Sequence, residues 1–147
     1  MRLEHELTID RPPGEVFSFL VNPANLPAWQ HSVQRVASPD DVALGTRFTE
    51  ERSRLGRLFR STLEVVELEQ DRLFTIRVVD GPVTARIRHE LAIVPGGTRL
   101  SVQAEADLNR LPRVLRSLVA RTVEGELARD FTALKRNLES TPGSASS

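Results

Sequence analysis

The sequence contains no cysteine among its 147 residues, which excludes disulfide bonds, thiolate metal sites and thiol catalysis. Aromatic residues are scarce, with six phenylalanines, no tyrosine and a single tryptophan, Trp29. No apolar run approaches the roughly 20 residues that a membrane-spanning helix needs. The first ten residues alternate charged and apolar side chains, without the apolar centre of a signal peptide. We therefore expect a cytoplasmic protein without membrane insertion.

Neither sign of charge dominates, because 20 basic residues balance 20 acidic ones. Nearly all the basic residues are arginines, and Lys135 is the only lysine, a bias typical of a GC-rich bacterial genome. The arginines are interleaved with acids, so the chain lacks the basic stripe that usually marks a nucleic-acid-binding surface. We expect no nucleic-acid partner.

Motifs for metals and cofactors are absent as well. The three histidines, His5, His31 and His89, are far apart, and none has a ligand-like spacing to another histidine or to a carboxylate. The sequence has no nucleophile elbow, phosphate-binding loop or dinucleotide fingerprint. We expect neither a metal nor a cofactor.

The chain begins with a strand and two short helices. Leu3, His5, Leu7 and Ile9 alternate with polar residues, which predicts a strand with one buried face. Prolines then favour a short helix over about 13–20, since proline is tolerated in a first helical turn. A second short helix is predicted over about 23–29, with an irregular end at Pro27.

Six more strands are predicted in the middle of the chain, at about 31–37, 46–54, 57–68, 72–79, 83–94 and 98–107. The strongest hairpin signal is Pro95-Gly96-Gly97-Thr98, because glycine supplies the positive φ that tight turns need. Alternation is clearest on either side of this turn.

The hydrophobic period then changes from two to between three and four. From Leu111 to Leu138 it predicts one amphipathic helix of about 28 residues, or roughly 40 Å. The apolar stripe of this helix matches the face that a sheet must bury. The fold class predicted is α+β, with a seven-stranded curved antiparallel sheet wrapped around the long C-terminal helix. We predict a single domain over 1–139 and a disordered tail over 140–147.

Four segments resemble the START-like, or SRPBCC, superfamily and its polyketide cyclase/dehydrase-like group. They are Arg11-Pro12-Pro13-Gly14-Glu15-Val16-Phe17, Asn22-Pro23-Ala24-Asn25-Leu26-Pro27-Ala28-Trp29, Gly45-Thr46-Arg47-Phe48 and Gly96-Gly97-Thr98-Arg99-Leu100. The resemblance implies a helix-grip fold with a cavity between sheet and long helix that binds lipids, polyketides or other apolar molecules. The matching residues are architectural and carry no catalytic signature, so the resemblance does not settle activity.

Two residues are candidates for the inner end of such a pocket. His89 is in register with Ile87 and Leu91, so it faces inward, where an imidazole can exchange a proton near neutral pH. The alternative is a hydrogen-bonded core histidine. Trp29 either closes one end of the pocket or stacks on a ligand, or else it anchors the short helices to the sheet as a core residue.

Charged residues form a second group of candidates. Glu50 and Arg52 alternate in register with Phe48, so an inward Phe48 makes them a base and an anion-binding group inside the cavity. The alternative is a solvated edge strand. His31 lies at the pocket mouth or at a solvated strand start. The residues predicted to bind ligand are Trp29, His31, Phe48, Glu50, Arg52, Ile87, His89, Val123 and Leu127.

Three functions remain open from the sequence. The first is binding of a small hydrophobic ligand by a monomer or homodimer. The second is a polyketide cyclase or dehydratase with His89, Arg52 and Glu50 as catalytic candidates and His31 as a further acid–base partner. The third is a protein-partner module, such as the chaperone-ATPase activators of this superfamily.

Overall fold

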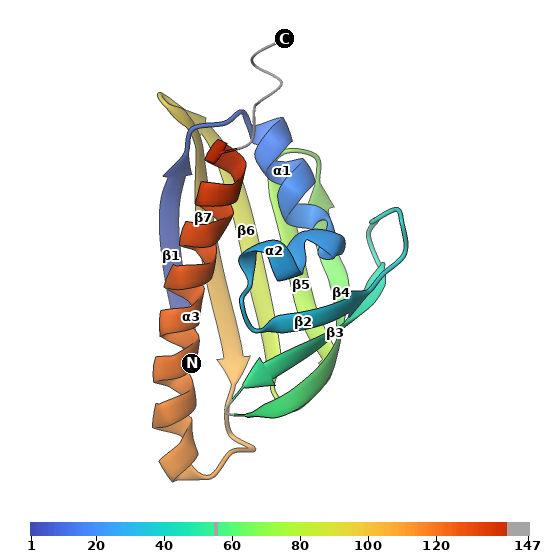
Figure 1. Ribbon diagram of the computed structural model, residues 1–147, viewed down its shortest axis with the longest axis vertical. Helices are drawn as coiled ribbons and strands as arrows, with labels where there is room; N and C mark the ends of the chain where they lie inside the picture. The colour runs from blue at the N-terminus through green and yellow to red at the C-terminus, as the bar shows by residue number, and fades with distance from the viewer. Residues whose placement is uncertain (55, 141–147) are drawn as a thin grey trace.

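The computed structural model describes residues 1–54 and 56–140. Its elements follow the predicted order: β1 (Arg2–Ile9), α1 (Pro13–Val21), η1 (Pro23–Asn25), α2 (Leu26–Trp29), β2 (Val33–Ala37), β3 (Arg47–Arg54), β4 (Arg57–Glu69), β5 (Leu73–Asp80), β6 (Thr84–Val94), β7 (Gly97–Asp107) and α3 (Arg113–Ser140). The long helix and the short helices lie on the same side of the sheet (Figure 1).

All seven strands form one antiparallel sheet in the order β1-β7-β6-β5-β4-β3-β2. The sheet curves, so β2 and β3 cross in front of the other strands (Figure 1). In the hairpin between β6 and β7, Gly97 has a φ of +132° and lies against the Ile9 carbonyl, where a Cβ atom would collide. Glycine is therefore required where this hairpin meets the end of β1. The predicted fold class, a helix-grip arrangement, is confirmed.

The structure corrects some predicted boundaries. The second short helix is divided into the 3₁₀ turn η1 and the single α-turn α2. Pro27 is the second residue of that α-turn and does not end it, because a proline needs no hydrogen-bond acceptor in a first turn. The Asn22 side chain caps η1 by accepting from the Ala24 amide at 3.1 Å. The predicted tail over 140–147 lies, from residue 141 onward, outside the described residues.

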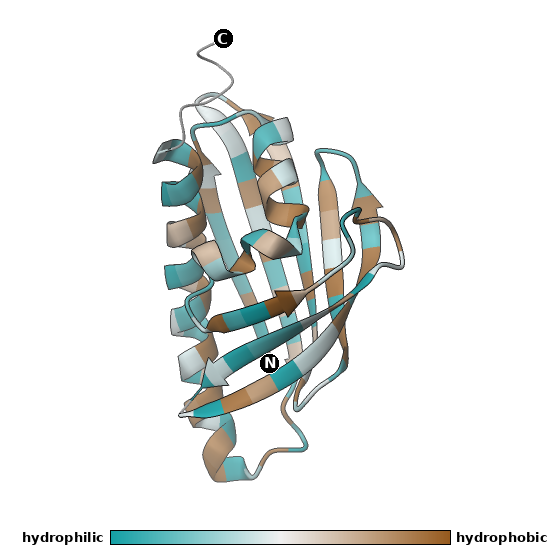
Figure 2. Cartoon of the chain, turned by 45° about the vertical axis from the view of Figure 1, so that its right-hand side comes forward, coloured by the Kyte–Doolittle hydropathy of each residue, from teal (hydrophilic) through white to brown (hydrophobic). Residues whose placement is uncertain are grey.

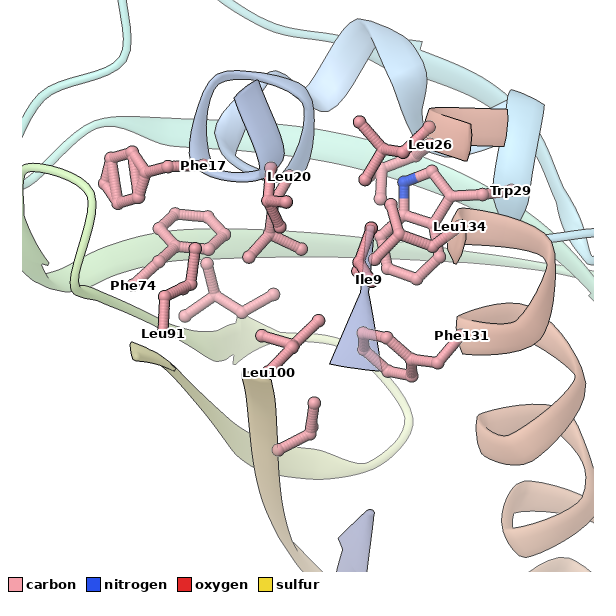
Figure 3. Close-up of a cluster of buried hydrophobic side chains, with 14 of the residues drawn as sticks. Ile9, Phe17, Leu20, Leu26, Trp29, Phe74, Leu91, Leu100, Phe131 and Leu134 are labelled. Atoms are coloured by element: carbon pink, nitrogen blue, oxygen red, sulfur yellow. The ribbon is translucent and has the colours of Figure 1, made fainter. Parts of the chain in front are cut away.

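One half of the interior is filled by apolar side chains from the short helices, the sheet and the end of α3. Figure 3 shows them packed together: Ile9, Phe17, Leu20, Leu26, Trp29, Phe74, Leu91, Leu100, Phe131 and Leu134. Each exposes less than a tenth of its surface. We call this half the packed half. It fixes the C-terminal part of α3 against the sheet.

Polar contacts reinforce the packed half where α3 ends. The backbone amide of Asp10 donates to the Glu139 carboxylate at 2.8 Å, and Lys135 donates to the same carboxylate at 2.7 Å. Lys135 also donates to the Thr8 carbonyl at 2.6 Å. The hydrogen bond from Asp10, and after it the one from Lys135, lower the pKa of Glu139.

Candidate functional site

The other half of the interior is not filled in this way. Within α3 the buried residues begin only at Glu126, so residues 113–125 contain none. Apolar side chains at the end of the sheet nearest this part of the helix are only partly buried: Leu3, Val78, Ala85, Ile87, Ala104 and Ala106. Their register across the sheet puts them on the same face as the packed core. We call the region formed by these side chains and residues 113–125 the open half.

A row of rings separates the two halves. Phe131 of α3 lies 5.0 Å from Trp29, 5.9 Å from His89 and 6.0 Å from His5, measured between ring centroids. His89 stacks on Phe74 at 5.4 Å. Trp29 is therefore a core anchor, and its indole nitrogen has no hydrogen-bond partner among the described residues.

His89 faces inward as predicted and is 3% exposed. Its Nδ1 lies 2.9 Å from the Phe74 carbonyl oxygen, which only accepts hydrogen bonds, so Nδ1 carries the proton. Nε2 of the neutral ring is consequently an acceptor. Burial lowers the pKa of His89 to about 4. The predicted proton exchange near neutral pH is therefore wrong, because a buried imidazole resists charging.

Glu50 and Arg52 also face inward. Phe48 is 3% exposed and Glu50 6% exposed, and β2 covers the edge of β3. The alternative of a solvated edge strand is therefore wrong. Arg52 pairs with Glu50 at 3.0 Å and donates to the Ser32 hydroxyl at 3.0 Å and to the Gln30 side chain at 2.6 Å. This network uses every nitrogen of the Arg52 guanidinium and holds it rigid.

Sequence reasoning missed Arg54, Glu126 and Asp130. Arg54, the last residue of β3, pairs with Glu126 of α3 at 2.7 Å. Burial lowers the pKa of Arg54, with repulsion from Arg52 as the next cause. One helical turn further along α3, the Oδ1 atom of Asp130 lies 2.9 Å from Nδ1 of His31. These two contacts join the β2–β3 region to α3.

A signal for two of these residues exists in the sequence. Glu126 and Asp130 follow Val123 at helical spacings of three and four, so they continue the line of inward positions on the helix. Acidic residues in an apolar line need basic partners. The period of two that brings Arg52 inward brings Arg54 inward as well.

The remaining predicted ligand-binding residues are divided between the two halves. Phe48 belongs to the packed core. Ile87, Val123 and Leu127 are half-buried, and Ile87 and Leu127 pack against that core. Among the described residues, no hydrogen bond or ion pair joins His89 to Glu50 or Arg52. The proposed catalytic candidates are thus two separate groups.

Two hollows open on the surface of the described residues. One, of about 720 Å³, surrounds the end of the sheet and takes residues from both faces, including Arg77, Ala85 and Glu105. The other, of about 560 Å³, lies beside α3 and is lined by Trp29, His31 and Arg129, among others. Neither is an enclosed cavity between sheet and helix.

Over residues 1–54 and 56–140, no group of three or more histidine, aspartate or glutamate side chains is placed to hold a metal ion. In the same part of the chain, no helix has the length and apolar character to cross a membrane.

Known structures share this fold over almost the whole chain. The protein TTHA0849 from Thermus thermophilus is 16% identical, with a TM-score of 0.84 over 97% of this chain and 100% of the other. The Zhui aromatase/cyclase from Streptomyces sp. R1128 is 16% identical, with a TM-score of 0.82 over 99% and 97%. At such identities the likeness establishes the fold alone. A search of curated proteins finds no match. The family model described as polyketide cyclase / dehydrase and lipid transport matches residues 1–139, and the chain therefore belongs to this family, within the START-like superfamily.

Proposed function

We propose that the protein binds a small apolar molecule in the open half. The observation that carries the proposal is the contrast along α3, which buries Phe131, Leu134 and Leu138 but no residue of 113–125. Six apolar side chains at the nearby end of the sheet are likewise only partly buried. Because leaving apolar surface in water is unfavourable, a ligand that covers both surfaces binds there and stabilises the protein.

Polar groups at the edges of the open half can orient a bound ligand. His89 offers Nε2 as a hydrogen-bond acceptor for a ligand hydroxyl. The Nε of Arg54 is buried without a hydrogen-bond partner, so its guanidinium is not fully used by Glu126. An apolar ligand with a hydroxyl at one end and a carbonyl or carboxylate at the other fits these groups.

The experiment is a titration with the apolar fluorophore anilinonaphthalene sulfonate, read from the probe and from quenching of Trp29, the only tryptophan. Ala104 is half-buried on the inner face, and its neighbour Gln103 is exposed on the outer face. Ala104→Phe is expected to weaken binding at least tenfold by filling the open half, whereas Gln103→Phe leaves it unchanged. Equal binding by both variants contradicts the proposal.

A second candidate function is cyclisation or dehydration of a polyketide-like substrate. The Zhui protein is an aromatase/cyclase, and this chain has inward charged side chains, Glu50, Arg52 and Arg54, beside its open half. With its low pKa, His89 acts in this scheme by orienting a hydroxyl and not as a strong base. If the His89→Gln variant and the Arg54→Gln variant both retain turnover, this second function is contradicted.

A further inference from the structure

The start of α3 carries an unusual combination of side chains. Residues 110–121 contain four arginines and no acid, although charge is balanced over the whole chain. In the same stretch Val114 is 85% exposed, Leu115 42% and Leu118 48%. We call these three residues the apolar patch.

The apolar patch is a continuous feature of one helical face. Val114 and Leu118 are four residues apart, and Leu115 lies beside them, so the three side chains meet on the same side of α3. The apolar stripe was predicted to cover the sheet, yet here it faces solvent. Figure 2 shows hydrophobic colour at the start of α3, at one end of the molecule.

The charges around the patch have one sign. Arg110, Arg113 and Arg121 form no ion pair within the described residues, so they are available to an external anion. Arg116 has a structural use, since it donates to the Leu111 and Asn109 carbonyls at 3.0 and 3.1 Å and fixes the loop before the helix. The nearest acids in sequence, Asp107 and Glu124, flank the stretch. One carboxylate oxygen of Asp107 accepts a hydrogen bond from the Asn109 backbone amide at 2.9 Å.

We infer that the start of α3 docks on an anionic lipid surface, with the apolar patch entering the boundary between headgroups and acyl chains. Exposed apolar side chains surrounded by arginines are the pattern of interfacial helices, whose apolar face enters the lipid while the cations meet lipid phosphates. Arginine stems extend along apolar surface and keep their charge at the phosphates. This docking needs no helix that crosses the membrane.

Docking at this position has a structural consequence. The patch is on the same stretch of α3, residues 113–125, that borders the open half. A lipid surface in contact with it lies next to the space between helix and sheet. Docking does not depend on the proposed ligand, because the patch and its arginines are on the surface whether or not the open half is occupied.

The test uses the full chain with sedimenting vesicles of phosphatidylcholine, alone or mixed with phosphatidylglycerol. We expect binding to the mixed vesicles, at least tenfold weaker binding to phosphatidylcholine alone, and weakening with salt. Replacing either Arg113 or Arg121 by glutamine is expected to weaken binding about fivefold. Replacing both is expected to weaken it about 25-fold. Val114→Ser with Leu118→Ser is expected to weaken it at least tenfold.

Matched controls lie elsewhere on the molecule. Arg136→Gln changes an exposed arginine in the last third of the same helix, and Ile93→Ser changes an apolar residue that is 81% exposed on the β6–β7 hairpin. Both controls are expected to bind as the unchanged protein does. Because the chain has no cysteine, Val114→Cys provides a single labelling site, and a polarity-sensitive dye there is expected to shift to the blue on mixed vesicles.

Three results would overturn the inference: no binding to the mixed vesicles, equal binding by patch variants and controls, or binding with no shift of the dye at position 114. One form of the first result is a protein that does not bind vesicles but forms a dimer that the patch variants dissociate. That result would assign the patch to a second copy of the chain.

Discussion

Arg54 at the end of β3 and Glu126 in the middle of α3 form an ion pair of 2.7 Å that joins the sheet to its helix at the border of the open half. Glu126 is 7% exposed, and its first buried neighbours along α3, Asp130 and Phe131, belong to the packed half. The pair therefore marks the point where close packing of the helix begins.

Removing one partner of this pair is expected to destabilise the protein. Arg54→Gln leaves a nearly buried carboxylate without its cation, which costs roughly 2 kcal/mol, less than for a fully buried pair because the Arg54 side chain is partly exposed. Urea unfolding measures the loss. The double variant Arg54→Gln, Glu126→Gln is expected to recover part of it. Glu4→Gln, in an exposed pair with Arg2, is the control and should change stability by no more than about 0.5 kcal/mol.

His89 makes stability depend on pH. The pKa of His89 is lowered to about 4 in the folded protein and lies near 6.5 in the unfolded chain, so the unfolded state binds the proton first. This contribution to stability is complete above pH 6.5 and is lost as pH falls toward 4, by roughly 3 kcal/mol. His89→Phe is expected to remove this part of the pH dependence. A variant whose stability still falls by as much over that window would show that other groups cause it.

Phe131 is expected to hold the boundary between the two halves together. It contacts the rings of Trp29, His89 and His5, and Phe131→Ala leaves a cavity that costs about 3–4 kcal/mol. The emission of Trp29 should shift to the red as its ring loses this cover. Thr132→Ala, which changes the exposed neighbouring residue, serves as the control variant. If Phe131→Ala unfolds at the same urea concentration as Thr132→Ala, the packed half does not depend on this contact.

The two halves of α3 should differ in hydrogen exchange. Amides in residues 126–138 lie over the packed half and are expected to exchange at least tenfold more slowly than those in residues 115–124, which lack buried side chains. A ligand in the open half should slow the faster group. Equal protection along the helix in the free protein would contradict the division into halves.

The sheet was predictable because its alternation is a local property. Leu3 to Ile9 and the strands beside Gly96-Gly97 show the period of two that a single buried face imposes, and their register follows from it. The length of α3 was predictable for the same reason, since the period of three to four continues to Leu138. The predicted boundaries differ from the observed ones by two residues at most, except within η1 and α2.

The candidate site was less predictable because it depends on which elements meet. Whether Glu50 and Arg52 face solvent depends on β2, a strand of only five residues that covers their edge. The pairing of Arg54 with Glu126 joins positions 72 residues apart, and periodicity contains no information on such a contact. The apolar stripe of α3 was read as buried throughout, whereas only the curvature of the sheet decides how far the helix is covered.

The measurement that tests the central claim most directly is native mass spectrometry of the protein incubated with anilinonaphthalene sulfonate, beside Ala104→Phe and Gln103→Phe. Binding in the open half predicts one probe per chain, lost on denaturation, in the unchanged protein and in Gln103→Phe, and a bare mass for Ala104→Phe. A bare mass for all three proteins, or an adduct that Ala104→Phe retains in full, would contradict a binding site between α3 and the sheet.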